Sequence, residues 1–482
     1  MTLPFPAVHA RFPRLAAFFL AALLLAALPA CAETDAQVAV PAGALVIQGG
    51  WLFDATGDLR IPNPGIVIAD SVIVRIGVPE GTPLPDDVTR VELSDEDTVI
   101  PGLFDLHAHY AVDLLGQGRI DDTTVYPALF LANGVTSTFP AGEVDPEGMR
   151  ELRLALEAGT RTGPRLFNSG PYYGSWRQGW SRDISADSIR AEVDHWVAQG
   201  AHGFKAKGIS PEHLEALIQA AHAHGATVTG HLDSGFRNSV NPRDAIRMGI
   251  DRIEHFEGGD AMPSDRSAYA SLEVMTPDTP GFREVVALYV EHGTFYNATL
   301  TAYGYFGAQE PEVFEDFASE REFLTPWARA RVEERLPRPP LEQFERIYQV
   351  KHALLKEFHD LGGAHLITLG TDHPSWGQFF SGFGAHREMH AMVRAGLPPA
   401  SVLRIATVNG ARALRVDDRL GTVEVGKLAD LVILAGNPLD DIRVTRAPRW
   451  VVKNGRLHDP EALLAEVRGR LGPAGPGEAD RW

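Results

Sequence analysis

Residues 99–113 read VIPGLFDLHAHYAVD, an apolar run that ends in two histidines separated by one residue. Side chains in a β-strand alternate between its two faces, so His107 and His109 point toward the same side. Asp105 stands two residues before the first of them. Two imidazoles at one strand end can bind a metal ion, but paired histidines also occur at surfaces without one. The rest of the chain has to decide between these two interpretations.

Around this stretch, short apolar runs alternate with amphipathic helical segments from about residue 100 to residue 416. The helical patterns at 210–225 and 241–249 each end in glycine, a common helix terminator. Alternating strands and helices indicate a parallel sheet, and eight strands favour a closed, TIM-like (β/α)8 barrel in the α/β class over an open doubly wound sheet. The expected strands lie at 102–107, 134–139, 164–170, 202–208, 226–231, 251–256, 293–300 and 365–372.

The sequence pattern at the two ends of the chain differs from that of the middle. Short β-rich runs separated by Gly and Pro breaks occupy residues 44–77 and return near the end, in GTVEVGKLADLVILAGNPL (421–439) and PRWVVKNGR (448–456). We therefore predict one small β-sandwich domain built from both termini. The expected boundaries are 32–100 and 416–465 for the two parts of the β-sandwich, 101–415 for the barrel and 466–482 for a tail.

The N-terminal 31 residues are predicted to be an export signal. Arg11 and Arg14 precede an apolar stretch at 15–30 that is short for a membrane-spanning helix. Cys31 follows Leu-Pro-Ala, which resembles the lipobox of bacterial lipoproteins, so we expect a lipidated Cys31 and a location in the periplasm or cell envelope. Cleavage after Ala32, which would discard the cysteine, and an uncleaved anchor are the alternatives.

Composition limits the partners and the metal ligands. The net charge is −19, and an acidic surface repels nucleic acid and anionic lipid, so we expect no nucleic-acid partner and no membrane contact beyond the lipid anchor. Cys31 is the single cysteine of the chain. An internal disulfide and a thiolate zinc cluster are therefore excluded, and any metal must be bound by nitrogen and oxygen ligands. The oligomeric state stays open.

Polar side chains end several of the expected barrel strands. The carboxyl ends of the strands in a parallel barrel meet at one face, where the active site lies. Lys205, His231 and His255 follow one another at intervals of about one compact βα unit, so they are expected on neighbouring strands at similar heights. The residues that this face would bring together are His107, His109, Lys205, His231, His255 and Asp372.

These residue types suit a hydrolytic metal site. Neutral imidazoles and carboxylates bind zinc and similar divalent ions. Two such ions about 3.5–4 Å apart can share a bridging hydroxide, a strong nucleophile at neutral pH. A charged lysine repels metal ions, but its carbamate, formed with carbon dioxide, is a bridging carboxylate-like group. Asp372 would bind one ion, take the proton of the attacking hydroxide and deliver it to the leaving group.

Several of these motifs resemble the amidohydrolase superfamily, in particular its imidazolonepropionase-like and prolidase-like branch of binuclear metal-dependent hydrolases. The C-terminal stretch 400–442 is similar to the C-terminal signature of that group, and the resemblance extends from residue 44 to about residue 457. The motifs that carry it are PGLFDLHAHY (101–110), GAHGFKAKG (200–208), VTGHLD (228–233), DRIEH (251–255) and LGTDHP (369–374).

The resemblance implies a role for each matched residue. His107 and His109 match ligands of the more buried ion, and His231 and His255 match ligands of the more exposed ion. Lys205 matches the bridging N6-carboxylysine, with Lys207 as the alternative. Asp372 matches the catalytic acid of the last strand. Two divalent ions are implied, with zinc as the default.

We expect the protein to be an exported amidohydrolase. It would cleave a C–N amide bond of a small peptide-like or N-acyl amino acid substrate. A prolidase-like dipeptidase is its most specific form, because imidazolonepropionate breakdown is cytosolic. A lactone or phosphotriester hydrolase with the same site and a non-catalytic binding scaffold are the alternatives. We further hypothesise that part of 302–358 covers the barrel mouth. Candidate substrate contacts are Tyr172, Tyr173, Trp176, Arg177, Tyr303 and His386.

Overall fold

The computed structural model describes residues 40–307, 310–314, 318–335, 341–373 and 379–482. The predicted export signal and Cys31 lie outside these residues. No helix within the described ranges is both long enough and apolar enough to cross a membrane.

The middle of the chain folds into a closed parallel barrel, which confirms the predicted fold class. Neighbouring strands pair in parallel, in chain order, and the first and last strands meet where Leu106 N donates to Leu369 O at 3.0 Å and Asp372 N donates to His107 O at 3.0 Å. This closure excludes the open sheet. The barrel strands are β6 (Leu103–Ala108), β9 (Val135–Pro140), β10 (Arg165–Leu166), β11 (Tyr172–Tyr173), β12 (Gly203–Lys207), β13 (Thr227–His231), β14 (Arg252–Glu254), β15 (Phe295–Asn297) and β16 (Ile367–Thr368).

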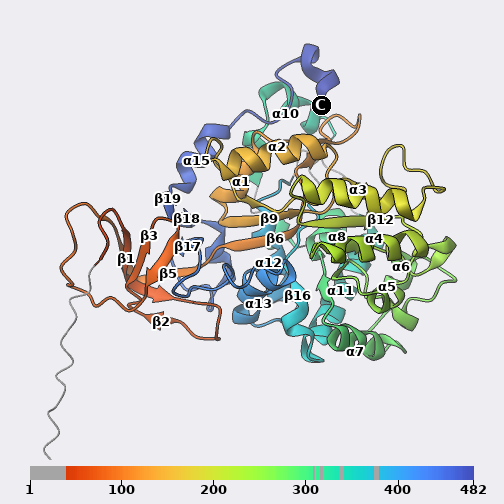
Figure 1. Cartoon of the computed structure of the whole chain (residues 1–482), viewed down its shortest axis with the longest axis horizontal. Helices are drawn as coiled ribbons and strands as arrows, with labels where there is room; N and C mark the ends of the chain where they lie inside the picture. The colour runs from red at the N-terminus through yellow and green to blue at the C-terminus, as the bar shows by residue number, and fades with distance from the viewer. Residues whose placement is uncertain (1–39, 308–309, 315–317, 336–340, 374–378) are drawn as a thin grey trace, which may run out of the picture. The chain divides into compact units, whose positions relative to one another are not determined.

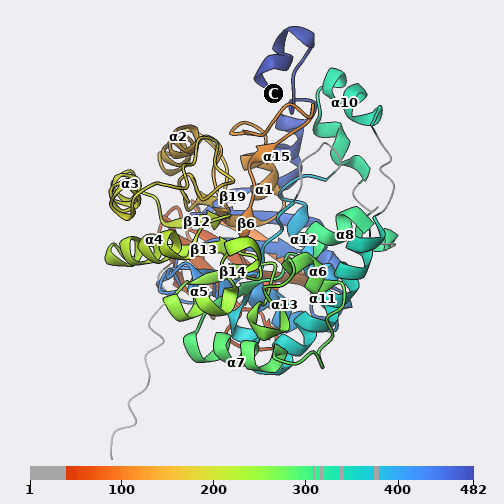
Figure 2. The same ribbon diagram turned by 90° about the vertical axis from the view of Figure 1, so that its right-hand side faces the viewer.

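Helices surround these strands (Figures 1 and 2). The start of α4 shows why the sequence folds this way, because the Ser210 side chain accepts a hydrogen bond from His213 N at 3.3 Å and proline occupies the first helical turn. Gly249 ends α5 with a left-handed φ of 94°. The helices between the strands are α1 (Tyr126–Ala132), α2 (Pro146–Glu157), α3 (Ala186–Ala198), α4 (Pro211–Ala223), α5 (Pro242–Met248), α6 (Ala268–Leu272) and α7 (Phe282–His292), and α12 (Gly384–Arg394), α13 (Pro399–Ile405) and α14 (Val408–Ala413) follow the last strand.

A separate mixed sheet combines strands from both ends of the described chain. Its strand order is β19-β18-β17-β5-β1-β3-β4, with β2 paired to β1. Ile47, Ile66, Val99 and Ile433 are completely buried in its core. The helix α15 (Pro460–Val467) and the short helix η6 (Pro476–Arg481) follow this sheet. Its strands are β1 (Leu45–Leu52), β2 (Ile61–Pro62), β3 (Ile66–Ala69), β4 (Val72–Arg75), β5 (Thr89–Pro101), β17 (Leu431–Leu434), β18 (Pro448–Lys453) and β19 (Arg456–His458).

The connection between β15 and β16 is largely helical, as its sequence pattern predicts. It contains α8 (Leu300–Gly307), α9 (Pro311–Phe314), η3 (Ala318–Phe323), α10 (Pro326–Glu333) and α11 (Glu342–Asp360). Glu320 of this segment accepts hydrogen bonds from Arg387 Nη2 of α12 and from Phe380 N, the latter at 2.6 Å, and both charged side chains are fully buried. This pair fixes the insertion to the helices that follow the last strand.

A buried carboxyl group links the second and third strand positions of the barrel. Glu143 Oε1 accepts hydrogen bonds from Asn168 Nδ2 at 2.6 Å and from Ser169 N at 3.1 Å, and only 3% of the residue is exposed. Burial, with a smaller contribution from the nearby Asp121 carboxylate, raises the pKa of Glu143 from 4.5 to about 8. Between pH 4.5 and about 8, Glu143 is therefore protonated in the folded protein and ionised in the unfolded chain.

This raised pKa predicts a pH dependence of stability. The contribution of Glu143 is fully present below pH 4.5 and is lost as the pH rises to about 8, so the free energy of unfolding should fall across this window. The Glu143→Gln variant keeps an oxygen that accepts both bonds and carries no charge. We expect it to lose this slope and to exceed the wild type by about 1–3 kcal/mol at high pH. Urea unfolding at a series of pH values measures both effects. Glu147→Gln on α2 is the exposed control, and a Glu143→Gln slope equal to that of the wild type would contradict the assignment.

Candidate metal centre

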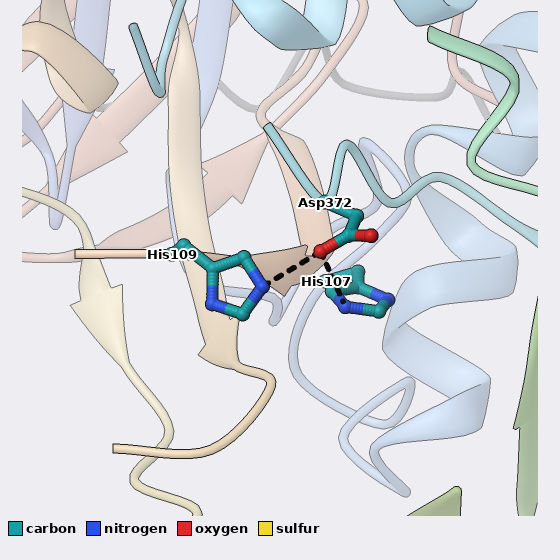
Figure 3. Close-up of side chains that lie close together, drawn as sticks. All are labelled: His107, His109 and Asp372. Carbon is teal, nitrogen blue, oxygen red and sulfur yellow. Dashed lines mark hydrogen bonds and ion pairs between the residues drawn. The ribbon is translucent and has the colours of Figure 1, made fainter. Parts of the chain in front are cut away.

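His107, in β6, and His109, just after the strand, both face Asp372, which follows the last barrel strand (Figure 3). His109 Nε2 lies 2.8 Å from Asp372 Oδ1, and His107 Nε2 lies 3.2 Å from the same oxygen. Only 1% of His107 and 7% of His109 are exposed. They are therefore buried side chains directed at one point, and the surface interpretation of this pair is excluded.

Asp105 links the first barrel strand to the segment that follows the last one, where His107, His109 and Asp372 meet. Its carboxylate accepts hydrogen bonds from His107 N at 3.1 Å, Thr371 N at 3.2 Å and Thr371 Oγ1 at 2.8 Å. It thereby joins the first strand to the residue before Asp372. Burial is the main reason why the pKa of Asp105 rises to about 6.

Two residues of the cluster have an uncommon backbone conformation. The φ angle is +68° at His255 and +43° at Asp372, in the left-handed region that costs a non-glycine residue about 1–3 kcal/mol. At His255 this turn places two consecutive side chains at the same cluster, because Glu254 Oε2 lies 3.6 Å from His107 Nδ1 and His255 Nε2 lies 3.6 Å from Asp372 Oδ2. The strained backbone thus sits at the strand ends that form the site.

The hydrogen bonds of His255 identify its tautomer. Thr299 Oγ1 donates to Ala298 O at 2.7 Å, so this hydroxyl accepts from His255 Nδ1, which lies 2.6 Å away. His255 therefore carries its proton on Nδ1, and its Nε2 lone pair faces the cluster. The ring of His231 lies beside it, with the two ring centroids 4.3 Å apart.

Lys205 and Glu254 form a buried pair within the barrel. Lys205 Nζ donates to Glu254 Oε2, and Thr229 Oγ1 donates to Glu254 Oε1 at 2.8 Å. Lys205 is 1% exposed. Sequence reasoning did not select Glu254, since strict strand alternation would direct it away from the face that His255 occupies. The one feature of the sequence that pointed to Glu254 is its position directly before His255, a candidate metal ligand.

The charges of these groups suit a cation. Burial is the main cause that holds the pKa values of His107, His231 and His255 well below 6.5, and it lowers the pKa of His109 as well. Burial would raise the pKa of Asp372, but its interactions with His107 and His109 outweigh burial and hold it well below 3.8. The cluster therefore combines neutral imidazoles with an ionised carboxylate.

The spacing of the donor atoms fits a divalent ion. The donor atoms of His107, His109 and Asp372 lie within 4.8 Å of one another, and so do those of His107, Glu254 and His255. Ligand atoms about 2.1 Å from one ion are about 3.4 Å apart in a tetrahedron, close to the separations observed here. His107 Nδ1, His109 Nδ1 and His255 Nε2 are buried without a hydrogen-bond partner among the described residues. Buried imidazole nitrogens without a hydrogen-bond partner fit a site in which they bind a metal ion.

Two adjoining cavities open over the cluster, and both are lined by Lys207, His231 and Tyr269. The first has a volume of about 140 Å³ and also contacts His109 and Asp372. The second has a volume of about 240 Å³ and is mainly apolar. Its other lining residues are Ser175, Trp176, Gly208, Ile209, Leu232, Asp233, Ser239, Val240 and Phe256.

Four of the candidate substrate contacts lie between β10 and β12, and their surroundings differ. Trp176 lines the second cavity, with its ring beneath Lys207 Nζ at 3.8 Å. The buried ring of Tyr172 packs against Gly142, whose φ of +95° and missing Cβ leave room for it. Tyr173 packs against Phe204 on the outward side of β12. Arg177 Nη1 pairs with Glu192 Oε1 of α3 at 2.8 Å.

The other two candidates come from later segments. The buried ring of Tyr303 lies 6.2 Å from the ring of His255 and 6.2 Å from that of Tyr269, between centroids. His386 is buried on α12, where its Nδ1 lies 3.1 Å from Thr445 Oγ1. From the helical insertion, Ala302 and Phe306 of α8 line the first cavity.

The sequence model of the amidohydrolase family matches residues 98–457 of this chain. The chain belongs to the amidohydrolase family. This amidohydrolase is accordingly a hydrolase that acts on carbon–nitrogen bonds, and the resemblance inferred from its motifs is confirmed. It is 23% identical to the ochratoxinase of Aspergillus niger in an alignment 474 positions long, which covers 86% of this chain and 86% of the ochratoxinase.

Solved structures share the fold of this amidohydrolase. A Xaa-Pro dipeptidase with bound methionine aligns with a TM-score of 0.64 and 23% identity, over 86% of this chain and 100% of the other. The structure of the Aspergillus niger ochratoxinase aligns with a TM-score of 0.60 and 20% identity, over 89% of this chain and 100% of the other.

Proposed function

We propose that this amidohydrolase cleaves the amide bond of a small peptide-like or N-acyl amino acid substrate, with prolidase-like dipeptidase activity as the most specific form. The observation that carries the proposal is the convergence of the buried His107, His109 and His255 on Asp372, beside a cavity that His109, His231 and Asp372 line. Similarity to a Xaa-Pro dipeptidase and to an ochratoxinase supports an amide as substrate.

Six side chains would hold two divalent ions, with zinc as the default for such nitrogen-rich sites. When bound, the ions supply a Lewis acid for the carbonyl oxygen and a water that is readily deprotonated. Burial is the main cause that lowers the pKa of Lys205 well below 10.5, which favours the neutral amine that carbon dioxide requires to form a carbamate. The ligands are His107 and His109 for one ion, His231 and His255 for the other, Lys205 as N6-carboxylysine, and Asp372.

Asp372 carries the proton in this scheme. Its Oδ1 lies 2.8 Å from His109 Nε2 and 3.2 Å from His107 Nε2, whereas Oδ2 lies 3.6 Å from His255 Nε2. Oδ2 is therefore the atom that takes the proton of the attacking water and passes it to the amide nitrogen as the C–N bond breaks. The two products are a carboxylic acid and an amine.

The proposal includes export. It rests on the basic and apolar N-terminal stretch and on Cys31 after Leu-Pro-Ala, which favour a lipid-anchored protein of the cell envelope. Amides available outside the cytoplasm, such as dipeptides and acylated amino acids, are then the natural substrates.

A library of dipeptides and N-acyl amino acids, assayed beside lactones and phosphotriesters, tests the proposed reaction. We expect turnover of several amides, with the highest kcat/KM among dipeptide-like compounds. Turnover of lactones or phosphotriesters without any amide cleavage would overturn the proposal in favour of an esterase-type reaction at the same site.

A further inference from the structure

Lys207 occupies an unusual position beside the site. It ends β12 two residues after Lys205, so both side chains leave the same face of the strand, and it pairs in register with His231. Its Cα therefore lies about 6.6 Å further along the strand than that of Lys205, toward the carboxyl end of the strand. Lys207 lines both cavities over the cluster.

Lys207 differs from every other lysine of the chain in its partners. The sequence has six lysines, and five of them make a hydrogen bond or ion pair with an oxygen. Within the described part of the chain, Lys207 makes no such contact, and its Nζ rests on the ring of Trp176, 3.8 Å from the centroid. Its charge is therefore available to a molecule in the cavity.

A second cation lies on the same indole ring. The guanidinium carbon of Arg119 is 5.6 Å from the Trp176 centroid, and Arg119 lines the first cavity. No ion pair of Arg119 occurs among the residues that the structure describes. Of the two acids that line this cavity, Asp113 Oδ1 accepts from Gly116 N at 2.6 Å and Asp372 Oδ1 lies 2.8 Å from His109 Nε2. Lys207 and Arg119 thus share the Trp176 ring, and neither forms an ion pair with a carboxylate among the described residues.

The second cavity completes the pattern. Beside Lys207 and Trp176 it is lined by Ile209, Leu232, Val240, Phe256 and Tyr269, with fewer polar residues, among them Asp233 and Ser239. A ligand that suits both cavities carries an anionic group next to an apolar one. In an N-acyl amino acid or dipeptide, only the amide nitrogen and one carbon separate the scissile carbonyl from the carboxylate, which suits cations one strand step from the cluster.

We propose that Lys207 and Arg119 bind the free carboxylate next to the scissile amide, while the second cavity takes the apolar side chain of the same residue. This inference rests on the proposed function and narrows it. The substrates are amides of apolar amino acids with a free carboxylate, and amides that lack the carboxylate are poor substrates.

Paired substrates test this assignment. We expect the wild type to cleave N-acetyl-leucine with a kcat/KM at least about 10-fold above that of N-acetyl-leucinamide at the acetyl bond, since a charge-assisted hydrogen bond contributes about 10–10² in affinity. Lys207→Met should lose this preference, mainly through a higher KM for the acid, and Lys207→Arg should restore part of it. Lys356→Met on the outside of α11 is the matched control. Equal losses for acid and amide in Lys207→Met would overturn the inference.

A binding measurement separates this inference from the proposed reaction. By calorimetry, we expect the wild type to bind 4-methylpentanoate more tightly than 4-methylpentanol, and Lys207→Met to lose that difference. A difference that survives in Lys207→Met would overturn the inference, because the carboxylate would then be bound elsewhere. Loss of the difference in Lys207→Met, together with no cleavage of any amide, would support the carboxylate site and overturn the amide reaction alone.

Discussion

Replacement of Asp372 by asparagine is expected to lower kcat for amide hydrolysis by about 10³-fold, in the range that a lost general acid–base contributes. The amide oxygen of asparagine can still accept a hydrogen bond from His109 and lie against His107 as the carboxylate does, so the cluster should keep its arrangement. The asparagine nitrogen, in place of Oδ2, cannot take a proton from water. The change therefore removes the proton carrier while it leaves the fold intact.

Three measurements make this result interpretable. Steady-state kinetics give kcat and KM, metal analysis shows whether the variant still binds ions, and thermal unfolding shows whether it folds. Asp194→Asn on the exposed surface of α3 makes the same chemical change far from the cavity and should retain wild-type kcat. An Asp372→Asn enzyme that cleaves the best amide at the wild-type rate would show that the proton moves through another group.

Replacement of Lys205 by alanine is expected to have the second largest effect. The bridging group between the two ions would be lost, so the bound metal should fall from about two ions per chain to about one or fewer, and kcat/KM should fall by more than about 10²-fold. The side chain is 1% exposed, so the change also leaves an interior space beside Glu254. Metal analysis and kinetics on the same preparations measure both losses.

Small carboxylic acids provide the control for Lys205→Ala. Formate or propionate can enter the space and supply the carboxylate that the carbamate would have offered, so we expect partial recovery of metal binding and activity with increasing acid. Lys356→Ala on α11 should show neither the loss nor the recovery. Full metal content and activity in Lys205→Ala without any added acid would contradict a bridging role for this lysine.

The fold could be predicted well from local patterns. Each barrel strand is an apolar run between helix signals, and the closing glycine of helices such as α5 marks where the chain turns back to the next strand. The third strand position is less regular, because β10 and β11 are separate short strands in the loop that carries Asn168 and Ser169. Hydrogen bonds from these two residues to Glu143 of another loop hold the segment, and such long-range contacts leave no local pattern.

Site residues could be predicted where two like residues alternate along a single strand. His107 and His109 obey simple alternation, and Lys205 and Lys207 do too. Glu254 could not be predicted, because the left-handed backbone at His255 brings two neighbouring side chains to the same cluster. The partners of Arg177 and Lys207 were equally hidden, because Glu192 and Trp176 reach them only in the folded chain.

The content of divalent metal per chain tests the central claim most directly. The purified protein, treated with zinc and bicarbonate and freed of unbound ions, should contain about two ions per chain by elemental analysis, with amide cleavage rising in parallel. Well under one ion per chain after the same treatment, in a folded protein, would contradict a binuclear centre at His107, His109, Lys205, His231, His255 and Asp372.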